Sequence, residues 1–123
     1  MKSKKGLSCT LWFLLPALLL GCSPCDEEII FESHSPDNTH TAVASYRECG
    51  AIARDATHII VRPNSKGSNE TEQVIFGARN QQTIELSWKS PSELTVRCAG
   101  CRADDITFQV SKVGGLRITY ELP

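Results

Sequence analysis

The sequence has no apolar run long enough to cross a membrane as a helix. Its longest, Leu7–Leu20, covers 14 residues and is interrupted by two hydroxyl residues and by Pro16. A transmembrane helix needs about 20 consecutive apolar residues, and a proline removes a backbone donor from a helix interior. Because the run follows a short basic start, it predicts a secretory signal instead.

The sequence also lacks the excess of basic residues typical of nucleic-acid-binding proteins. It has 13 Lys and Arg against 14 Asp and Glu. Three lysines lie in the first five residues, so loss of the signal leaves ten basic and 14 acidic residues, a net charge of −4. This balance, without a basic stripe, argues against binding to nucleic acid or electrostatic docking on anionic lipid.

No group of residues has the spacing of a catalytic or metal site. His34, His40 and His58 lack tight ligand spacing, so exposed or turn-capping roles are favoured. Asp104 and Asp105 are adjacent, but neighbours in a strand point to opposite faces of a sheet, so turn or solvent contacts are expected. We therefore predict that the chain is not an enzyme and holds no metal.

The apolar run ends at Leu19-Leu20-Gly21-Cys22, without an A-x-A cleavage site. This ending resembles the lipobox of bacterial lipoproteins. The resemblance implies transfer of diacylglycerol to the Cys22 thiol, cleavage between Gly21 and Cys22, and removal of residues 1–21. Two or three acyl chains hold a protein firmly on a membrane, and this covalent lipid is the only cofactor expected. An ordinary signal peptide followed by a buried cysteine is the alternative.

Ser23, which follows Cys22, is not Asp. By analogy with bacterial lipoproteins, this favours the periplasmic face of the outer membrane over retention at the inner membrane. Residues 22–28 form only a short linker before the first expected strand, so the folded domain, residues 29–123, should lie close to the bilayer.

Six cysteines occur in the chain; Cys9 leaves with the signal and Cys22 carries the lipid. The four that remain are Cys25, Cys49, Cys98 and Cys101. An even number of thiols in an exported chain predicts two disulfides, with three possible connectivities. We favour pairing Cys25 with Cys49, which ties the N-terminus to an early strand, and Cys98 with Cys101, which flanks a two-residue turn.

Short alternating segments fill the rest of the chain. The expected strands are residues 28–32, 39–49, 57–62, 73–77, 83–88, 93–97, 106–110 and 116–122. Turn-forming residues separate them, and residues 50–57 are the one weak helical option. About seven or eight short strands predict a small, single-domain, all-β antiparallel sandwich or partly open barrel, stapled by disulfides.

Cys98-Ala99-Gly100-Cys101 is the segment that most suggests chemistry. In thiol–disulfide proteins a C-x-x-C motif opens a helix, whose N-terminus lowers the pKa of a thiol. Here the motif lies between two expected strands, so a structural disulfide is favoured. A redox role for Cys98 and Cys101 remains an alternative, as does a zinc site shared with Cys25 and Cys49.

Ser35-Pro36-Asp37-Asn38 and Arg47-Glu48-Cys49-Gly50-Ala51 form a pattern that continues along the chain. It resembles a family of small, uncharacterised bacterial envelope proteins marked by S-P-D-G and R-D-C-G-A-T-T. The chain departs from that pattern at Asn38, at Glu48 and at Ile52-Ala53, where the family has a pair of threonines. The family has no assigned activity, so the resemblance implies a fold and no catalytic residues.

These features predict a lipid-anchored envelope lipoprotein whose domain binds or supports another envelope component without catalysis. Two alternatives remain at this point: a redox protein using Cys98 and Cys101, and a β-barrel that binds a small ligand in its interior.

Overall fold

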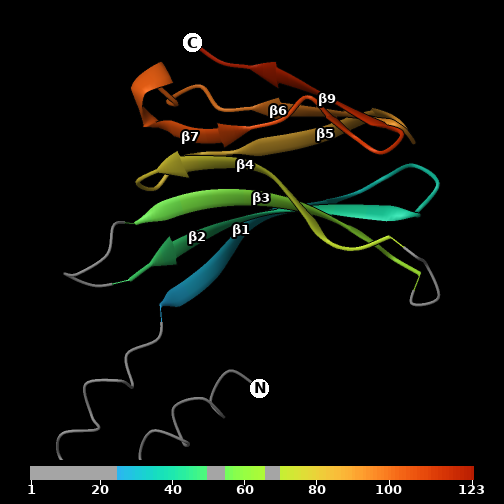
Figure 1. Ribbon diagram of the computed structural model, residues 1–123, viewed down its shortest axis with the longest axis horizontal. Helices are drawn as coiled ribbons and strands as arrows, with labels where there is room; N and C mark the ends of the chain where they lie inside the picture. Colours follow the sequence, from blue (N-terminus) through green and yellow to red (C-terminus); the bar gives the residue numbers. More distant parts are fainter. Residues whose placement is uncertain (1–24, 50–54, 66–69) are drawn as a thin grey trace, which may run out of the picture.

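The computed structural model describes residues 25–49, 55–65 and 70–123. The predicted signal, its cleavage site between Gly21 and Cys22, and the lipid site at Cys22 lie outside the described residues. In the described part, two β-sheets pack face to face (Figure 1). The expected all-β fold is confirmed, and of the two expected forms, a sandwich or a partly open barrel, the two separate sheets are a sandwich.

The strands follow the alternating segments closely. They are β1 (Asp26–His34), β2 (His40–Glu48), β3 (Ala56–Pro63), β4 (Gln73–Arg79), β5 (Glu85–Ser90), β6 (Glu93–Arg97), β7 (Ile106–Gln109), β8 (Lys112–Val113) and β9 (Leu116–Glu121), with the 3₁₀ turn η2 (Ala103–Asp105) before β7. Asp104 and Asp105 thus lie in a turn, as expected, and are not part of a strand. Of the proposed helical option, residues 50–54 lie outside the described residues and Ala56 and Thr57 belong to β3.

The first sheet has the strand order β1-β2-β3-β4-β7 and the second has β5-β6-β9-β8. Every pairing is antiparallel except that of β6 with β9, which is parallel. The chain therefore crosses from the second sheet to the first for β7 and returns for β8 and β9. No helix among the described residues is long and apolar enough to span a bilayer.

Period-two alternation produces most of the core. The buried apolar residues include Ala42, Ala44, Ile59, Ile75, Phe76, Leu86, Leu94, Val96 and Ile118. Ile75 and Phe76 are consecutive, and the pairing of β4 with β3 shifts its register at this point. Burying a large apolar side chain contributes about 1.5–3 kcal/mol, so this layer stabilises the sandwich. These buried side chains form the layer between the two sheets.

Two aromatic side chains join the sheets at their margins. The Trp88 indole N–H of β5 donates to the Ser33 carbonyl of β1 at 3.1 Å. The Tyr120 hydroxyl of β9 lies 3.0 Å from the Ile75 carbonyl and 2.6 Å from the Val110 carbonyl. Burial raises the pKa of Tyr120 to about 12, because the phenolate would lose its hydration.

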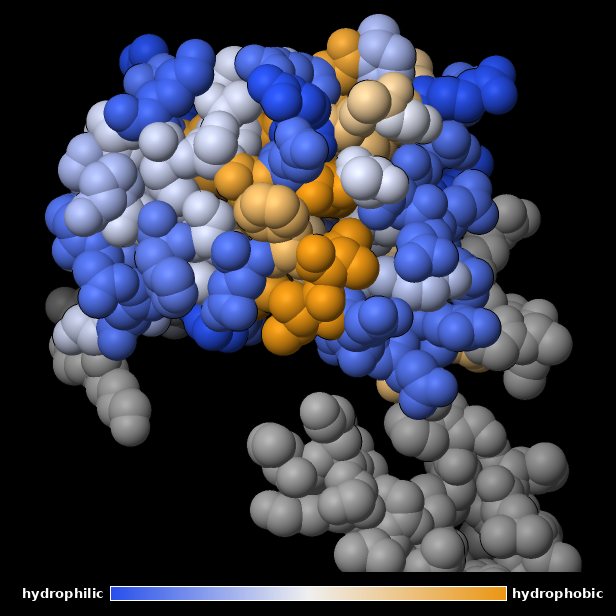
Figure 2. All heavy atoms as spheres, turned by 180° about the vertical axis from the view of Figure 1, so that it is seen from behind, coloured by the Kyte–Doolittle hydropathy of each residue, from blue (hydrophilic) through white to orange (hydrophobic). Residues whose placement is uncertain are grey.

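The aromatic residues divide between core and surface. Phe76 is fully buried, Trp88 and Tyr120 are partly buried, and Phe108 is 46% exposed. Phe108 lies on the edge strand β7. From behind, apolar side chains reach the surface in one strip between hydrophilic regions (Figure 2).

Candidate functional site

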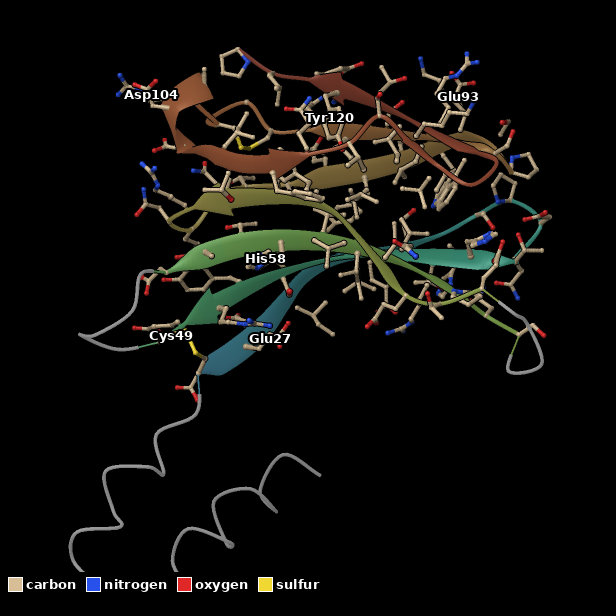
Figure 3. The ribbon with its side chains drawn as sticks, viewed as in Figure 1. Glu27, Cys49, His58, Glu93, Asp104 and Tyr120 are labelled. Atoms are coloured by element: carbon tan, nitrogen blue, oxygen red, sulfur yellow. A yellow bond between two sulfur atoms is a disulfide. The ribbon has the colours of Figure 1, made fainter. Side chains whose placement is uncertain are left out.

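Both disulfides lie at one end of the sandwich (Figure 3). Cys25 precedes β1 and bonds to Cys49, which follows β2, so this bridge fastens the open end of the first hairpin. Cys98 bonds to Cys101 directly after β6. This is the pairing favoured from the sequence, and we call this part of the molecule the disulfide end.

The Cys98–Cys101 bridge is inaccessible. The two residues are 0% and 1% exposed, and they are followed by η2 instead of a long helix. Thiol–disulfide exchange needs access to a sulfur atom, and the burial of both residues denies that access. The four cysteines among the described residues are paired in disulfides, whereas the zinc alternative would need them as four thiolates.

Each of the three histidines contacts different residues, and no contact joins one histidine to another among those described. The His34 Nδ1 atom is 2.8 Å from the Thr41 hydroxyl, and the His40 Nε2 atom is 2.8 Å from Glu70 Oε1. His58 lies in β3, opposite Ser45 and Gly77. Burial, and secondarily the positive charge of Arg47, lower the pKa of His58. The described residues hold no group of three or more His, Cys, Asp or Glu placed to bind a metal.

A serine organises the turn between β1 and β2. The Ser35 hydroxyl accepts from the backbone N–H groups of Thr39 and His40, each at 3.1 Å, and donates to Asp37 Oδ1 at 2.8 Å. Asn38 takes a φ of 59°, which asparagine tolerates better than most residues. The Thr39 and Ser35 hydroxyls hold the pKa of Asp37 below its ordinary value. The S-P-D-N segment is therefore a structural turn.

Three turns meet at the other end of the sandwich, which we call the turn end (Figure 1). They are the β1–β2 turn, the β5–β6 turn at Pro91-Ser92, and the β8–β9 turn at Gly114-Gly115. Together with the end of β3 and the residues that lead into β4, they enclose a cavity of about 520 Å³. Both sheets contribute to it.

The cavity has an apolar part and an acidic part. Val61, Val113 and Leu116 supply aliphatic surface, while Asp37 and Glu70 supply carboxylates. The His40 imidazole joins Glu70 through Nε2 and lies 3.0 Å from the Thr39 hydroxyl through Nδ1. No lysine, arginine, phenylalanine, tyrosine or tryptophan is among the described residues that line it.

This cavity was not predicted from the sequence, although two of the turns that form it are recognisable there. Ser35-Pro36-Asp37 and Ser90-Pro91-Ser92 are two similar turns, and each closes a hairpin. Because successive strands reverse direction, the number of strands between two turns predicts whether the turns lie at the same end of a sandwich. The sequence does not show that these two hairpins belong to different sheets and face each other.

No protein-family model matches the chain, and no curated protein or solved structure matches it either. The resemblance to an uncharacterised envelope family therefore stays a prediction, and the function must be argued from the residues themselves.

Proposed function

We propose that the chain is a bacterial envelope lipoprotein, anchored through lipid on Cys22, whose folded domain is a non-enzymatic binding module. The observation that carries the proposal is the sequence Leu19-Leu20-Gly21-Cys22 directly after a short apolar signal. A thiol beside a small residue at this point is what lipid transfer and cleavage require.

The position of the first disulfide supports an anchor close to the domain. Cys25 is only three residues after Cys22, a distance of at most about 10 Å in an extended chain. Since Cys25 is bonded to Cys49, an anchor at Cys22 would hold the disulfide end against the bilayer. The turn end would then lie on the far side of β1, whose nine residues extend about 30 Å.

The described side chains with reactive groups support a binding role more than catalysis. The cysteines form disulfides, the Tyr46 hydroxyl donates to Asp55, and the Arg97 guanidinium lies between Glu85 and Glu121. Such pairs fix strands relative to one another. The turn-end cavity is the feature that a binding partner or ligand would use.

The test is fractionation of a Gram-negative host that expresses the full chain, followed by intact mass measurement of the membrane-bound protein. Wild type should appear in the outer membrane with the mass of residues 22–123 plus acyl chains. Cys22→Ser should lose both the acyl mass and cleavage after Gly21. Cys9→Ser changes another cysteine near the N-terminus and should behave as wild type.

A protein released in soluble form without acyl mass would overturn the anchor. Acyl mass in the inner membrane only would leave the lipoprotein assignment in place and reject the inference drawn from Ser23.

A further inference from the structure

We propose that the outer face of the first sheet lies against the surface of a lipid bilayer, which it contacts through a belt of apolar side chains. The proposal goes beyond the binding role given above and rests on the lipid anchor at Cys22. Three observations carry it: the apolar side chains form a continuous belt, the charges beside the belt are paired, and the anchor lies close to one end of the belt.

Strand pairing arranges the outer face of the first sheet in rows that run across the strands. One row crosses all five strands and consists of Ile29, Ser45, His58, Gly77 and Phe108. A second row consists of Glu32, Val43, Ile60 and Val74. Between them lies a row that packs in the core, formed by Phe31, Ala44, Ile59 and Phe76. Because successive residues of a strand point to opposite faces, the first two rows both lie on the outer face.

The apolar members of these two rows form the apolar belt, which we define as Ile29, Val43, Ile60, Val74 and Phe108. Ile29, Val74 and Phe108 are 60%, 45% and 46% exposed, whereas Ile60 is half-buried and Val43 is buried. The belt thus gathers the three large apolar residues that are exposed in the described part of the chain. Scattered apolar residues on a surface need no explanation, but a contiguous group of them marks a contact with a protein or a membrane.

The surroundings of Gly77 confirm that Phe108 shares this face. A Cβ placed on Gly77 would lie 3.5 Å from His58 Cδ2 and 3.6 Å from Phe108 Cβ, so both side chains flank the glycine on the same side of the sheet. Phe108 therefore extends the apolar surface to the edge strand β7, and Ile29 extends it to the opposite edge strand, β1.

The polar residues of this face bring no unpaired charge to the belt. Arg47 lies 3.7 Å from Glu27, and Arg62 lies 3.4 Å from Glu32. Burial lowers the pKa of His58, so its imidazole is neutral at neutral pH. A surface without an isolated charge avoids the cost of desolvating one. The arginine stems can also lie along the apolar surface while their guanidinium groups stay among the lipid headgroups.

The place where the chain leaves the domain favours a bilayer as the occupant. Cys22, the proposed lipid site, precedes Ile29 by seven residues, which span at most about 25 Å when extended. An anchor at Cys22 would therefore keep the belt beside the membrane surface. A short tether gives the attached surface an effective concentration that is roughly millimolar, at which a contact too weak to hold a free protein is still made.

The size of the belt argues against a second copy of the chain. Five strands spaced about 4.8 Å apart and two rows about 7 Å apart give the belt an area of roughly 350 Å². A stable dimer buries about 800 Å² on each partner. The belt is too small for such an interface, whereas a tethered contact with lipid needs no minimum area.

The experiment is methyl NMR of the mature lipoprotein in phosphatidylcholine nanodiscs that contain a small fraction of lipid with a gadolinium chelate on its headgroup. The same lipid carrying lutetium is the diamagnetic blank. Thr95 and Thr119 pair with each other on the outer face of the second sheet and serve as the reference. Paramagnetic relaxation of the Ile60 and Val74 methyl groups should be at least about fivefold faster than that of the threonine methyl groups, because packed sheets lie about 10 Å apart and the effect falls with the sixth power of distance.

Two double variants test the belt itself. Ile29→Ser combined with Val74→Ser removes the aliphatic surface of two exposed positions. It should bring the ratio of the Ile60 and Thr119 relaxation rates below about twofold, since the lost apolar area weakens the contact. Ile29→Val combined with Val74→Ile keeps both positions apolar and should leave the ratio at its wild-type value.

Equal relaxation at Ile60 and Thr119 in wild type, or an unchanged ratio in the double serine variant, would overturn the proposal. Equal relaxation in particles whose mass shows a protein dimer would overturn it and assign the belt to a second copy. Intact mass, recorded first, shows whether Cys22 carries acyl chains. If it does not, coupling the Cys22 thiol to a maleimide lipid supplies the tether and the same comparison is made, so failure of the anchor and failure of the belt give different results.

Discussion

The two ends of the sandwich are closed by different kinds of interaction. At the disulfide end, covalent bonds join Cys25 to Cys49 and Cys98 to Cys101. The Tyr46 hydroxyl also donates a hydrogen bond to the Asp55 carboxylate there. At the turn end, hydrogen bonds of Ser35 and a left-handed glycine shape the hairpins around a cavity. The difference suggests a division of roles, in which one end is fixed firmly and the other presents a surface.

The largest effect should come from the exposed disulfide. Cys25→Ala combined with Cys49→Ala should lower the free energy of unfolding by about 3.5 kcal/mol, because the bridge closes a loop with a sequence separation of 24 residues and constrains the unfolded chain. Urea unfolding measures this. Mild reduction and alkylation of native wild type should reach Cys25 and Cys49 first and cause a similar loss, since Cys98 and Cys101 are buried. A loss of unfolding free energy under about 1 kcal/mol, or alkylation of Cys98 before Cys25, would contradict the view that the Cys25–Cys49 bridge fixes this end of the sandwich.

At the turn end, the largest single effect should come from Ser35. Ser35→Ala removes the acceptor of two backbone N–H groups in a buried position, so it should cost about 2 kcal/mol of the free energy of unfolding. Ser90→Ala is the matched variant, because the Ser90 hydroxyl accepts only one N–H, from Ser92, in an exposed turn. It should cost under about 0.5 kcal/mol. Equal losses in thermal or urea unfolding would show that Ser35 does not organise its turn.

The β8–β9 turn should distinguish two adjacent glycines. Gly114 has a φ of 59°, while Gly115 does not take the left-handed conformation, and neither would clash through an added Cβ. Gly114→Ala should therefore cost about 1 kcal/mol, whereas Gly115→Ala should leave stability within about 0.5 kcal/mol or raise it slightly. The same urea series measures both, and the reverse order would mean that space, and not backbone conformation, governs this turn.

The smallest effect at neutral pH concerns the tyrosines, of which the chain has two. The hydrogen bond to Asp55 raises the pKa of Tyr46 to about 12, and burial raises that of Tyr120 to about 12. Unfolded tyrosine titrates near pH 10, so the folded state binds more protons between pH 10 and 12. Stability should be complete below pH 10 and fall as the pH rises through 12.

Absorbance at 295 nm follows this ionisation directly. Folded wild type should show little phenolate at pH 10.5. In unfolded protein at the same pH, both tyrosines should contribute phenolate absorbance. Asp55→Ala should bring half of the signal down towards pH 10 and leave Tyr120 unchanged, while Tyr120→Phe should leave a single late transition. A wild-type transition at pH 10 in folded protein would refute both assignments.

Local patterns in the sequence predicted the strands because alternation and turn chemistry are local properties. Leu86 and Trp88 alternate with polar neighbours in β5, and the turn-forming residues Ser35-Pro36-Asp37 close the first hairpin. Sheet membership is not local. Nothing near Phe108 indicates that β7 joins β4 across the sandwich, which leaves that ring on an edge, and β8, with two residues, is too short to show alternation.

The candidate site was less predictable than the fold. The sequence shows His40 only as a histidine without ligand spacing. The joint position of Asp37 and His40 with Leu116 depends on two hairpins from different sheets meeting at one end. The cysteine pairing was easier to predict, because only three connectivities exist for four thiols. Cys98 and Cys101 are also only three residues apart, so a short turn brings them together.

The parallel pairing of β6 with β9 determines the order in which the protein can fold. β1 to β4 are successive antiparallel neighbours, so they can assemble while later residues are still missing. The second sheet cannot, because β9 comes last along the chain and lies between β6 and β8. Contacts between distant segments form slowly, so the part of the core that β9 completes stays uncovered until residues 116–121 arrive. During that interval the protein is most prone to aggregate and has the greatest need of a chaperone.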